Sequence, residues 1–425
     1  MSAAVPAPNR FYEPATDCHS GRLPLRLHGA IGSPYSMKML FLLRFRRIPH
    51  RFCTLGSYEE AGSKPPPVHK AVQHIAPRLT MADDSSINDS TPMLRHLERE
   101  YAGRSVLPQH PGLNFLNDLL EDFADEFVTK AMYHYRWVHD PEYASKMLAL
   151  GTGSVIVPLA RASGARGSDA VALANQGHAG ADAFVSQFAA MFRERQVSRL
   201  AVVGSNAATA PAIERAHMLL IARLDAHFAS GHRFLLGSRP SSADFALLGQ
   251  LYPMIALDLE TGALHRRASD RVTAWHHVCC DLSGLSIRDE SRGWLVNAAD
   301  ADAADAASVA RLPPTLVALL RDVVGACYAP FMIANARAVA AAQSECAFPM
   351  RVADGRGAPL AVEWRQPTFK YQAKCLAELR STFARLSAEH QRWVQTALAG
   401  TGCEVLLPVS AGGAEVAESA PRGKL

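Results

Sequence analysis

The feature that most constrains this chain is a short strand-like run that leads directly into a Ser-Pro helix start. Residues 25–29 read Leu-Arg-Leu-His-Gly, and Ser33-Pro34 follow them just before an apolar segment, Met37 to Phe45. Serine is a preferred N-cap and proline a preferred first helical residue, so this pair predicts a helix that starts at Pro34. The Ser33 hydroxyl then lies at the positive end of a helix dipole, where it can stabilise an anion.

Two later segments continue this pattern. Ala76-Pro77 opens a short β-prone run, and an X-Pro bond is a place where a cis peptide can occur. Another short strand at 86–88 precedes an Asp89-Ser90 turn and a helix from Met93 to Tyr101. The succession of strand, helix, strand, Pro-led strand, strand and helix is that of a thioredoxin-like domain.

Residues 23–102 resemble the N-terminal domain of glutathione transferases. Ser33-Pro34-Tyr35-Ser36 is similar to the active-site window of that family, Ala76-Pro77 to its cis-proline, and Asp89-Ser90 to its acidic-serine pair. The resemblance therefore implies a cis bond between Ala76 and Pro77. Downstream, Phe234 to Ala246 resembles a stretch of the family's helical domain and contains a capping-box variant, Ser241 to Asp244.

The resemblance covers residues 23–280 and implies an α/β thioredoxin-like domain followed by an all-α domain. Changes in composition and helical periodicity divide the rest of the chain. We expect a flexible tail at 1–22, a thioredoxin-like glutathione-binding domain at 23–103, a linker at 104–112, a helical transferase C-terminal domain at 112–283, a mostly helical extension with a β-hairpin at 284–409, and a disordered tail at 410–425.

A strongly amphipathic helix is predicted directly after the linker. Apolar residues from Leu116 to Ala131 recur at helical spacing on one face, while Asp118, Asp122 and Lys130 fall on another. Residues 151–182 lack a clear period and indicate a loop or broken helix. Further helices are predicted at 183–195, 210–229, 316–342 with an interruption at Pro330, 368–386 and 388–399, with a hairpin of 348–352 and 360–364 between them.

The resemblance implies that glutathione binds at the three matched segments. Ser33 would donate a hydrogen bond to the sulfur and favour the thiolate, whose unperturbed pKa is about 8.5. Ser36 matches the second position of the window and stays open as the alternative donor. Ser90 suits the carboxylate of the γ-glutamyl end and Asp89 its ammonium group. With Pro77 in cis, the backbone of Ala76 would pair with the cysteine of glutathione.

The second substrate implied by the resemblance is a small hydrophobic electrophile, held against the first long helix. Tyr133, His134 and Trp137 are the candidate contacts, although aromatic residues on such a stripe also serve as core. The run from His276 to Cys280 is no convincing metal site, because adjacent residues of a helix or strand point apart. We therefore expect glutathione as co-substrate and no metal.

Composition limits the remaining function classes. A formal net charge of +4 over 425 residues gives no basic field for nucleic acid. Eight cysteines without repeated spacing indicate free thiols in a reducing compartment. The first residues lack the apolar core of a signal peptide, and the apolar stretches at 245–257 and 323–334 are too short to span a membrane. A cytoplasmic protein is expected.

Two classes of function remain open. One is an enzyme that conjugates glutathione to small electrophiles, a detoxification chemistry, or uses the same thiolate as a peroxidase does. The resemblance implies that such an enzyme is a homodimer. The other is a non-catalytic protein of the same fold that binds or assembles. The extension favours the second class, as does His74-Ile75, which stands where relatives often carry Lys or Gln. The set of Ser33, Pro77, Asp89 and Ser90 favours the enzyme, which is the prediction made here.

Overall fold

The computed structural model describes residues 24–54, 77–151, 178–296, 312–353 and 359–408. Several predictions lie outside these residues. They are the two tails at 1–22 and 410–425, the bond between Ala76 and Pro77, and nearly all of the loop predicted at 151–182.

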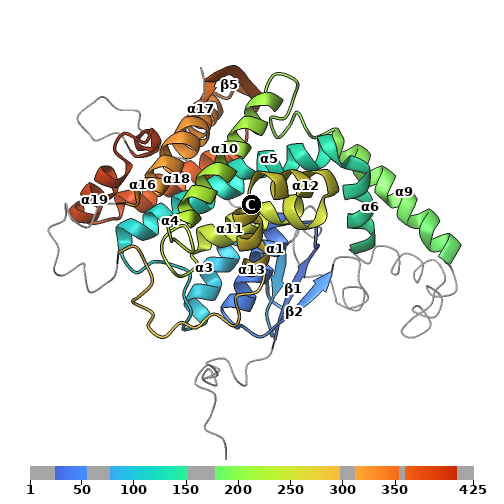
Figure 1. The fold of residues 1–425 in the computed structure, drawn as a ribbon, viewed down its shortest axis with the longest axis horizontal. Helices are drawn as coiled ribbons and strands as arrows, with labels where there is room; N and C mark the ends of the chain where they lie inside the picture. Colours follow the sequence, from blue (N-terminus) through green and yellow to red (C-terminus); the bar gives the residue numbers. More distant parts are fainter. Residues whose placement is uncertain (1–23, 55–76, 152–177, 297–311, 354–358, 409–425) are drawn as a thin grey trace, which may run out of the picture.

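The N-terminal region is a thioredoxin-like domain with a small mixed sheet, as predicted. The strand order is β2-β1-β3-β4, with β1 and β2 parallel and the other two pairs antiparallel. Buried apolar side chains of α1 pack it against the sheet on one side and the helical region on the other (Figure 1). The elements are β1 (Leu25–Gly29), α1 (Pro34–Phe45), β2 (His50–Thr54), β3 (Arg78–Thr80), β4 (Ser86–Asn88) and α3 (Ser90–Glu100).

The predicted amphipathic helix is a single run from Pro111 to His139 that changes its hydrogen-bond pattern three times. It consists of α4 (Pro111–Phe123), η1 (Ala124–Val128), α5 (Thr129–His134) and η2 (Tyr135–His139). Both η segments are π-helical, with hydrogen bonds from residue i to i+5. Each π segment rotates the following residues relative to a regular α-helix, which the apolar stripe in the sequence did not reveal.

The remaining helices of this region surround that run. The capping box between Ser241 and Asp244 is present, and α11 begins immediately after it. The predicted helix at 210–229 is confirmed as α10, and Gly231 just beyond it has a φ of +96°. The elements are α6 (Pro141–Gly151), α9 (His178–Val197), α10 (Ala210–Ala229), α11 (Ser242–Tyr252), η3 (Pro253–Leu257), α12 (Leu259–Ala268) and α13 (Asp270–Cys279).

The C-terminal extension consists of one long helix, a β-hairpin and two shorter helices. The predicted hairpin is confirmed, and β5 pairs antiparallel with β6 along its full length. In Figure 1 the extension, coloured orange to red, lies beside α4 and α10. Its elements are α16 (Pro314–Leu319), η4 (Leu320–Tyr328), α17 (Ala329–Ala340), β5 (Glu345–Val352), β6 (Leu360–Pro367), α18 (Lys370–Ala384), α19 (Ala388–Leu398) and η5 (Cys403–Leu406).

The long helix of the extension corrects two predictions. Pro330 does not interrupt it, because the residue stands in the first turn of α17, where the π pattern of η4 gives way to an α pattern. The apolar stretch at 323–334 is also not too short to span a membrane. It belongs to a 27-residue helix, Pro314–Ala340, whose length and composition would suffice, and 67% of its most apolar window is buried inside the protein. Such burial is typical of a core helix.

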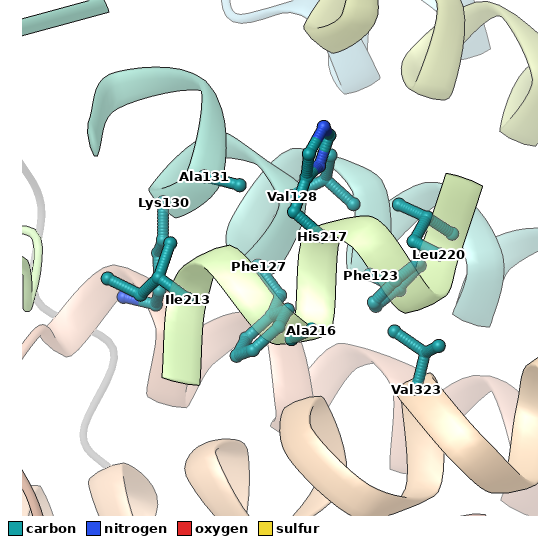
Figure 2. A pocket seen from close by; sticks show the side chains of 10 residues that line it. All are labelled: Phe123, Phe127, Val128, Lys130, Ala131, Ile213, Ala216, His217, Leu220 and Val323. Carbon is teal, nitrogen blue, oxygen red and sulfur yellow. The ribbon is translucent and has the colours of Figure 1, made fainter. Parts of the chain in front are cut away.

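One continuous hydrophobic core joins all three regions. It includes Leu27 of the sheet, Leu116 of α4, Phe331 of α17 and Trp364 of β6. A small apolar cavity remains within it, between the π segment η1, α10 and η4 (Figure 2). The cavity has room for roughly one water molecule, so it is too small for a substrate.

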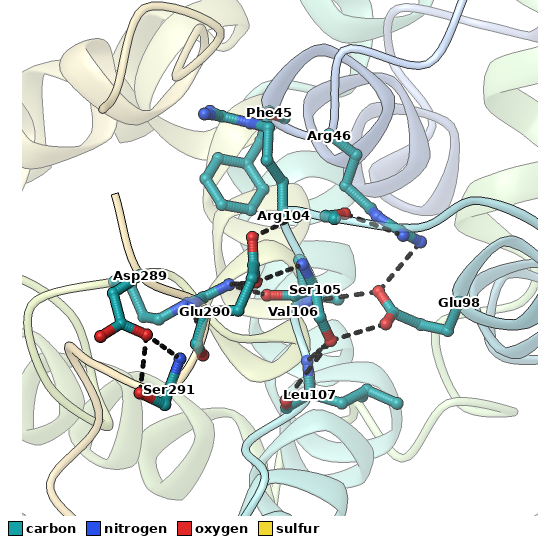
Figure 3. Close-up of polar contacts among 12 residues, drawn as sticks. Phe45, Arg46, Glu98, Arg104, Ser105, Val106, Leu107, Asp289, Glu290 and Ser291 are labelled. Atoms are coloured by element: carbon teal, nitrogen blue, oxygen red, sulfur yellow. Dashed lines mark hydrogen bonds and ion pairs between the residues drawn. The ribbon is translucent and has the colours of Figure 1, made fainter. Parts of the chain in front are cut away.

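Two guanidinium groups, the buried one of Arg46 and the half-buried one of Arg104, hold the start of the linker (Figure 3). Arg104 donates to the carbonyl oxygens of Phe45, Leu285 and Leu282, at 2.7 Å and 3.0 Å for the last two. Arg46 Nη1 pairs with Glu98 Oε1 at 3.0 Å beside the same segment. These contacts tie the thioredoxin-like domain to the segment after α13, so the linker is an ordered junction.

Candidate functional site

Three segments meet at one end of the small sheet. The register pairs His28 of β1 with Arg78 of β3, and Arg78 in turn with Asn88 of β4. Pro77 stands immediately before Arg78, and Asp89 immediately after Asn88. The loop after β1 leads from the same end into Ser33. The Ser-Pro window, Pro77 and the Asp89-Ser90 pair therefore meet at this end of the strands, which we call the sheet edge.

Ser33 caps α1 and lies at the rim of this edge. Its Oγ accepts a hydrogen bond from the backbone N–H of Ser36 at 3.3 Å, and its side chain is only partly buried. Because that bond uses an acceptor lone pair, the hydroxyl proton stays available to an anion beside the helix N-terminus. The placement suits Ser33 for the thiol-directed role.

Ser36 faces the interior instead. Its side chain is fully buried, and its Oγ accepts a hydrogen bond from the N–H of Ala30 at 3.3 Å. The hydroxyl of Tyr35, also in the window, donates to the carbonyl oxygen of Asp125 at 2.8 Å. Among the hydroxyls of the window, the structure therefore favours Ser33 over Ser36 as the donor to a bound sulfur.

The helical region supports the loop that precedes Ser33. Arg136 of η2 is buried and donates from Nη1 to the carbonyl oxygen of Gly32 at 2.5 Å. The same guanidinium pairs with the buried Asp258 at 3.2 Å. Burial raises the pKa of Asp258 to about 6, despite the opposing effect of Arg136. No local sequence pattern predicts this contact, because Arg136 and Gly32 are 104 residues apart.

The Asp89-Ser90 pair meets the extension through one hydrogen bond, made by Asp89. Asp89 caps α3 with a φ of +77°, and its Oδ1 accepts from the N–H of Thr91 at 3.4 Å. Its Oδ2 accepts a hydrogen bond from the Tyr371 hydroxyl at 2.8 Å, and Tyr371 belongs to the first turn of α18. Ser90 is only 4% exposed. The carboxylate that was expected to meet the ammonium group of glutathione thus already has a partner.

A buried set of charges lies beneath this edge. Lys38 of α1 pairs with Glu121 at 2.8 Å and with Asp125 at 2.6 Å. Burial alone would raise the pKa of Glu121, but Lys38 and Arg95 lower it to about 2. For Asp125 burial prevails and raises the pKa to about 6. Lys38 therefore joins the N-terminal domain to the long helix through an ion pair that water does not reach.

The polar face of the long helix continues this set under the extension. Asp122 accepts a hydrogen bond from Tyr328 of η4. Burial raises the pKa of Asp122 to about 7 and that of Glu126 to about 8. Lys130 is buried and donates to Gln366 of β6 at 2.8 Å, and its burial lowers its pKa to about 8. A face that looks polar in the sequence is thus covered by the extension.

The three candidate contacts of the electrophile are engaged within the helical region. Tyr133 donates its hydroxyl proton to Gln196 of α9, at 2.6 Å to Oε1. Trp137 is buried in a small cluster with Ala144 and Leu148. His134 is buried between Ser205 and Glu214. Of the three, Trp137 lies nearest in packing to the Ser33 loop. Its neighbour Leu148 packs so closely on Gly32 that a Cβ there would collide with it.

The His276 to Cys280 run lies on α13 with its side chains divided between two faces. His276 and Cys279 are buried, while His277 and Val278 are exposed. The two imidazoles differ in exposure, and their rings meet edge to face with centroids 5.4 Å apart. The seven cysteines within the described residues are all free thiols.

The chain was compared with known protein families and structures. Residues 27–105 match the family model of the glutathione S-transferase N-terminal domain. Among solved structures, it is similar to the Tau class glutathione S-transferase of mango (Mangifera indica), with 16% identity over 60% of this chain and 88% of that one, at a TM-score of 0.34. No curated protein sequence matches.

Two further solved structures show likenesses of the same order. A glutathione S-transferase of Ceriporiopsis subvermispora, in complex with glutathione, is 14% identical over 63% of this chain and all of that one, at a TM-score of 0.37. The β-etherase LigF of a Sphingobium strain is 14% identical over 63% and 96%, at 0.35. With scores this low, the assignment rests on the match over residues 27–105.

Proposed function

We propose that this chain, whose residues 27–105 match the N-terminal domain of the glutathione S-transferase family, binds glutathione at the sheet edge and activates the thiol. The observation that carries this proposal is the position of the Ser33 hydroxyl, partly exposed at the N-terminus of α1. There the helix dipole and one O–H donor both favour a thiolate over a thiol.

Within this proposal the two ends of glutathione have separate roles. The γ-glutamyl end meets Asp89 and Ser90 at the start of α3, and the sulfur meets Ser33. Pro77 stands at the same end of the sheet, and the backbone of Ala76, which lies outside the described residues, would pair with the cysteine of glutathione. A small hydrophobic electrophile then approaches from the side of the helical region, where Trp137 and Leu148 pack beside the loop that carries Gly32.

The decisive experiment measures thiolate absorbance against pH with glutathione bound. We expect the thiol of bound glutathione to titrate below about 8.5, its unperturbed pKa. Ser33→Ala should return that pKa toward the free value while glutathione still binds, because the γ-glutamyl contacts lie elsewhere. Ser36→Ala is the matched control, since its hydroxyl faces the interior. An unshifted thiol in the parent protein would exclude thiol activation.

A second candidate function, a non-catalytic binding or assembly protein of this fold, is favoured by one contact. Tyr371 holds the Asp89 carboxylate, and Ser90 lies buried beside it. Tyr371→Phe removes that hydroxyl and leaves the ring. If glutathione raises the melting temperature of this variant more than that of the parent, Asp89 is a ligand-binding group that the extension restrains. If glutathione stabilises neither protein, the non-catalytic function holds.

The proposal also includes a cytoplasmic homodimer. The free thiols are compatible with a reducing compartment. The dimer is proposed because proteins of this family are typically dimers. Light scattering tests it by comparing the mass in solution with the 46.0 kDa of one chain. A measured mass equal to that value at micromolar concentration would establish a monomer.

A further inference from the structure

Two histidines and one glutamate converge at the end of the long helix. His134 Nε2 lies 3.0 Å from Glu214 Oε1, and His139 Nε2 lies 3.3 Å from the same oxygen. One ligand atom from each of the three residues falls within 4.8 Å of the other two. His134 ends α5, His139 ends η2, and Glu214 stands in the first half of α10.

The π-helical segment is what brings the two imidazoles together. His134 and His139 are five residues apart, and a π-helix has its hydrogen bonds at this interval. In a regular α-helix, residues at this interval do not share a face, since neighbours there are three and four residues apart. The Tyr135 ring stacks on His139, with centroids 5.3 Å apart, and holds that imidazole on the same side.

The second nitrogen of His134 has its own partner. Nδ1 lies 2.8 Å from the hydroxyl oxygen of Ser205, which is itself 5% exposed. A proton on Nδ1 that is donated to Ser205 leaves the lone pair on Nε2, directed at Glu214. Metal-binding histidines usually have such an outer partner, which sets the tautomer and the orientation of the ring.

The distances and the exposure also suit a metal ion. Bonds of about 2.0–2.2 Å around a tetrahedral ion separate its ligand atoms by roughly 3.3 Å. The two measured separations from Glu214 Oε1 are close to that value. The His134 side chain is 1% exposed, whereas His139 is 41% and Glu214 43% exposed. An ion could enter from solvent and keep a water molecule in its fourth position.

We propose that His134, His139 and Glu214 form a binding site for a divalent transition-metal ion of the zinc type. The site is independent of the proposed glutathione chemistry. An ion there would link η2 to α10. Because η2 also carries Arg136, which holds Gly32 beside Ser33, the ion would stabilise the brace behind the glutathione edge.

The test uses full-length, tag-free protein in equilibrium dialysis against Zn²⁺, with metal content measured by mass spectrometry. We expect one equivalent per chain for the parent, and at least a tenfold loss of affinity for His139→Ala and Glu214→Gln. His277→Ala is the matched control, because it removes an exposed imidazole elsewhere and should bind like the parent. Ser205→Ala should weaken binding by about 10–100-fold.

Co²⁺ provides a second readout that does not depend on stability. A His₂Glu site should give Co²⁺ a visible absorption band of low-coordinate type, which His139→Ala abolishes while its circular dichroism stays that of the parent. Failure of the parent to retain one equivalent of Zn²⁺ would overturn the proposal. Retention of Zn²⁺ by His139→Ala and Glu214→Gln with the same affinity as the parent would overturn it as well.

Discussion

Lys38 shows how much a single residue can contribute to this structure. Its ammonium group is fully buried and touches two carboxylates of the long helix, Glu121 and Asp125. Burying an ion costs several kcal/mol, and only its partners offset that cost. The three charges therefore specify how α1 docks on the long helix more than they add to the free energy of unfolding.

Replacing Lys38 should be far more damaging than replacing an exposed lysine. Lys38→Met leaves the buried Asp125 without a cation and Glu121 with Arg95 alone, 3.9 Å away, which should lower the free energy of unfolding by about 3–5 kcal/mol. Lys374→Met is the control, because its ion pair with Glu378 is exposed and such pairs contribute about 0–1 kcal/mol. Urea denaturation followed by circular dichroism measures both. Equal losses for the two variants would contradict this account of the buried pair.

Glu126 should make the protein less stable as the pH rises. This is the opposite of the usual effect of a carboxyl group, whose pKa is lowered on folding. Its pKa is raised to about 8 in the folded protein, chiefly by burial and then by Asp122, whereas the unfolded value is about 4.3. Between these values the folded state holds more protons, so stability is fully present below pH 4.3 and falls as pH rises toward 8. Each pH unit costs up to about 1.4 kcal/mol per proton.

Glu126→Gln tests this sign. The difference in unfolding free energy between the variant and the parent should grow from pH 5 to pH 8 in favour of the variant. Taking the difference cancels the titratable groups that do not interact with Glu126. Lys130 does interact with it, but its lowered pKa acts in the opposite direction only above about pH 8, beyond this range. A difference that stays constant over this range would show that Glu126 is ionised throughout.

Among the elements, α1 and α11 approach each other most closely at a glycine. A Cβ on Gly249 would lie 2.5 Å from the carbonyl oxygen of Pro34 and 2.9 Å from Cβ of Lys38. Neither atom can swing away, since one is backbone and the other is bound to it. The helix that carries Ser33 is thus positioned by contact between two backbones.

Gly249→Ala should therefore destabilise the protein by about 1–3 kcal/mol, the usual cost of overpacking, although alanine is the better helix former. Gly284→Ala serves as control, because a Cβ there meets no atom within 4 Å. Thermal unfolding of the two variants gives the comparison. A Gly249→Ala protein as stable as the parent would mean that α1 can shift without cost.

Local chemistry explains why most elements were predictable from sequence. Ser33-Pro34, Asp89 and Ser241 to Asp244 are caps whose effect lies within one helical turn. The helices α1 and α11 begin where their caps indicate, whereas α3 begins at Ser90, three residues before the predicted start at Met93. The π segments were not predictable, since no local residue type specifies them. The pairing of His134 with His139 was missed for the same reason.

The candidate site was less predictable because its coverage comes from far along the chain. Tyr371 and Asp89 are 282 residues apart, and nothing near Asp89 announces the contact. Likewise Asp122 and Lys130 form a polar stripe that is typical of a solvent face. That face is buried because the extension packs on it.

On the scale of the whole molecule, the extension is a structural part of the core. Trp364 of β6 packs on Phe127 of η1, and Phe348 of β5 on Phe331 of α17, with ring centroids 6.4 Å apart in both pairs. Arg104 and its carbonyl partners join the first domain to the helical region in the same rigid way. The chain should accordingly unfold as one unit.

A protein ending at residue 341 tests this unity. Loss of the hairpin, α18 and α19 exposes the apolar faces of η1 and α17 and leaves Lys130 without Gln366. We expect no cooperative thermal transition by circular dichroism. A protein ending at residue 408 is the control, since it lacks only the tail that the sequence predicts to be disordered. A cooperative melt of the shorter protein at the parent's temperature would make the extension an accessory.

The hydrogen bond between Tyr371 and Asp89 has a thermodynamic consequence for signalling. A ligand that needs the Asp89 carboxylate must compete with the tyrosine, so its apparent affinity scales with the fraction of molecules in which that bond is open. Coupling of this kind is reciprocal. If glutathione binds Asp89 as proposed, anything that draws the first turn of α18 away would tighten its binding, and bound glutathione would in turn free that turn.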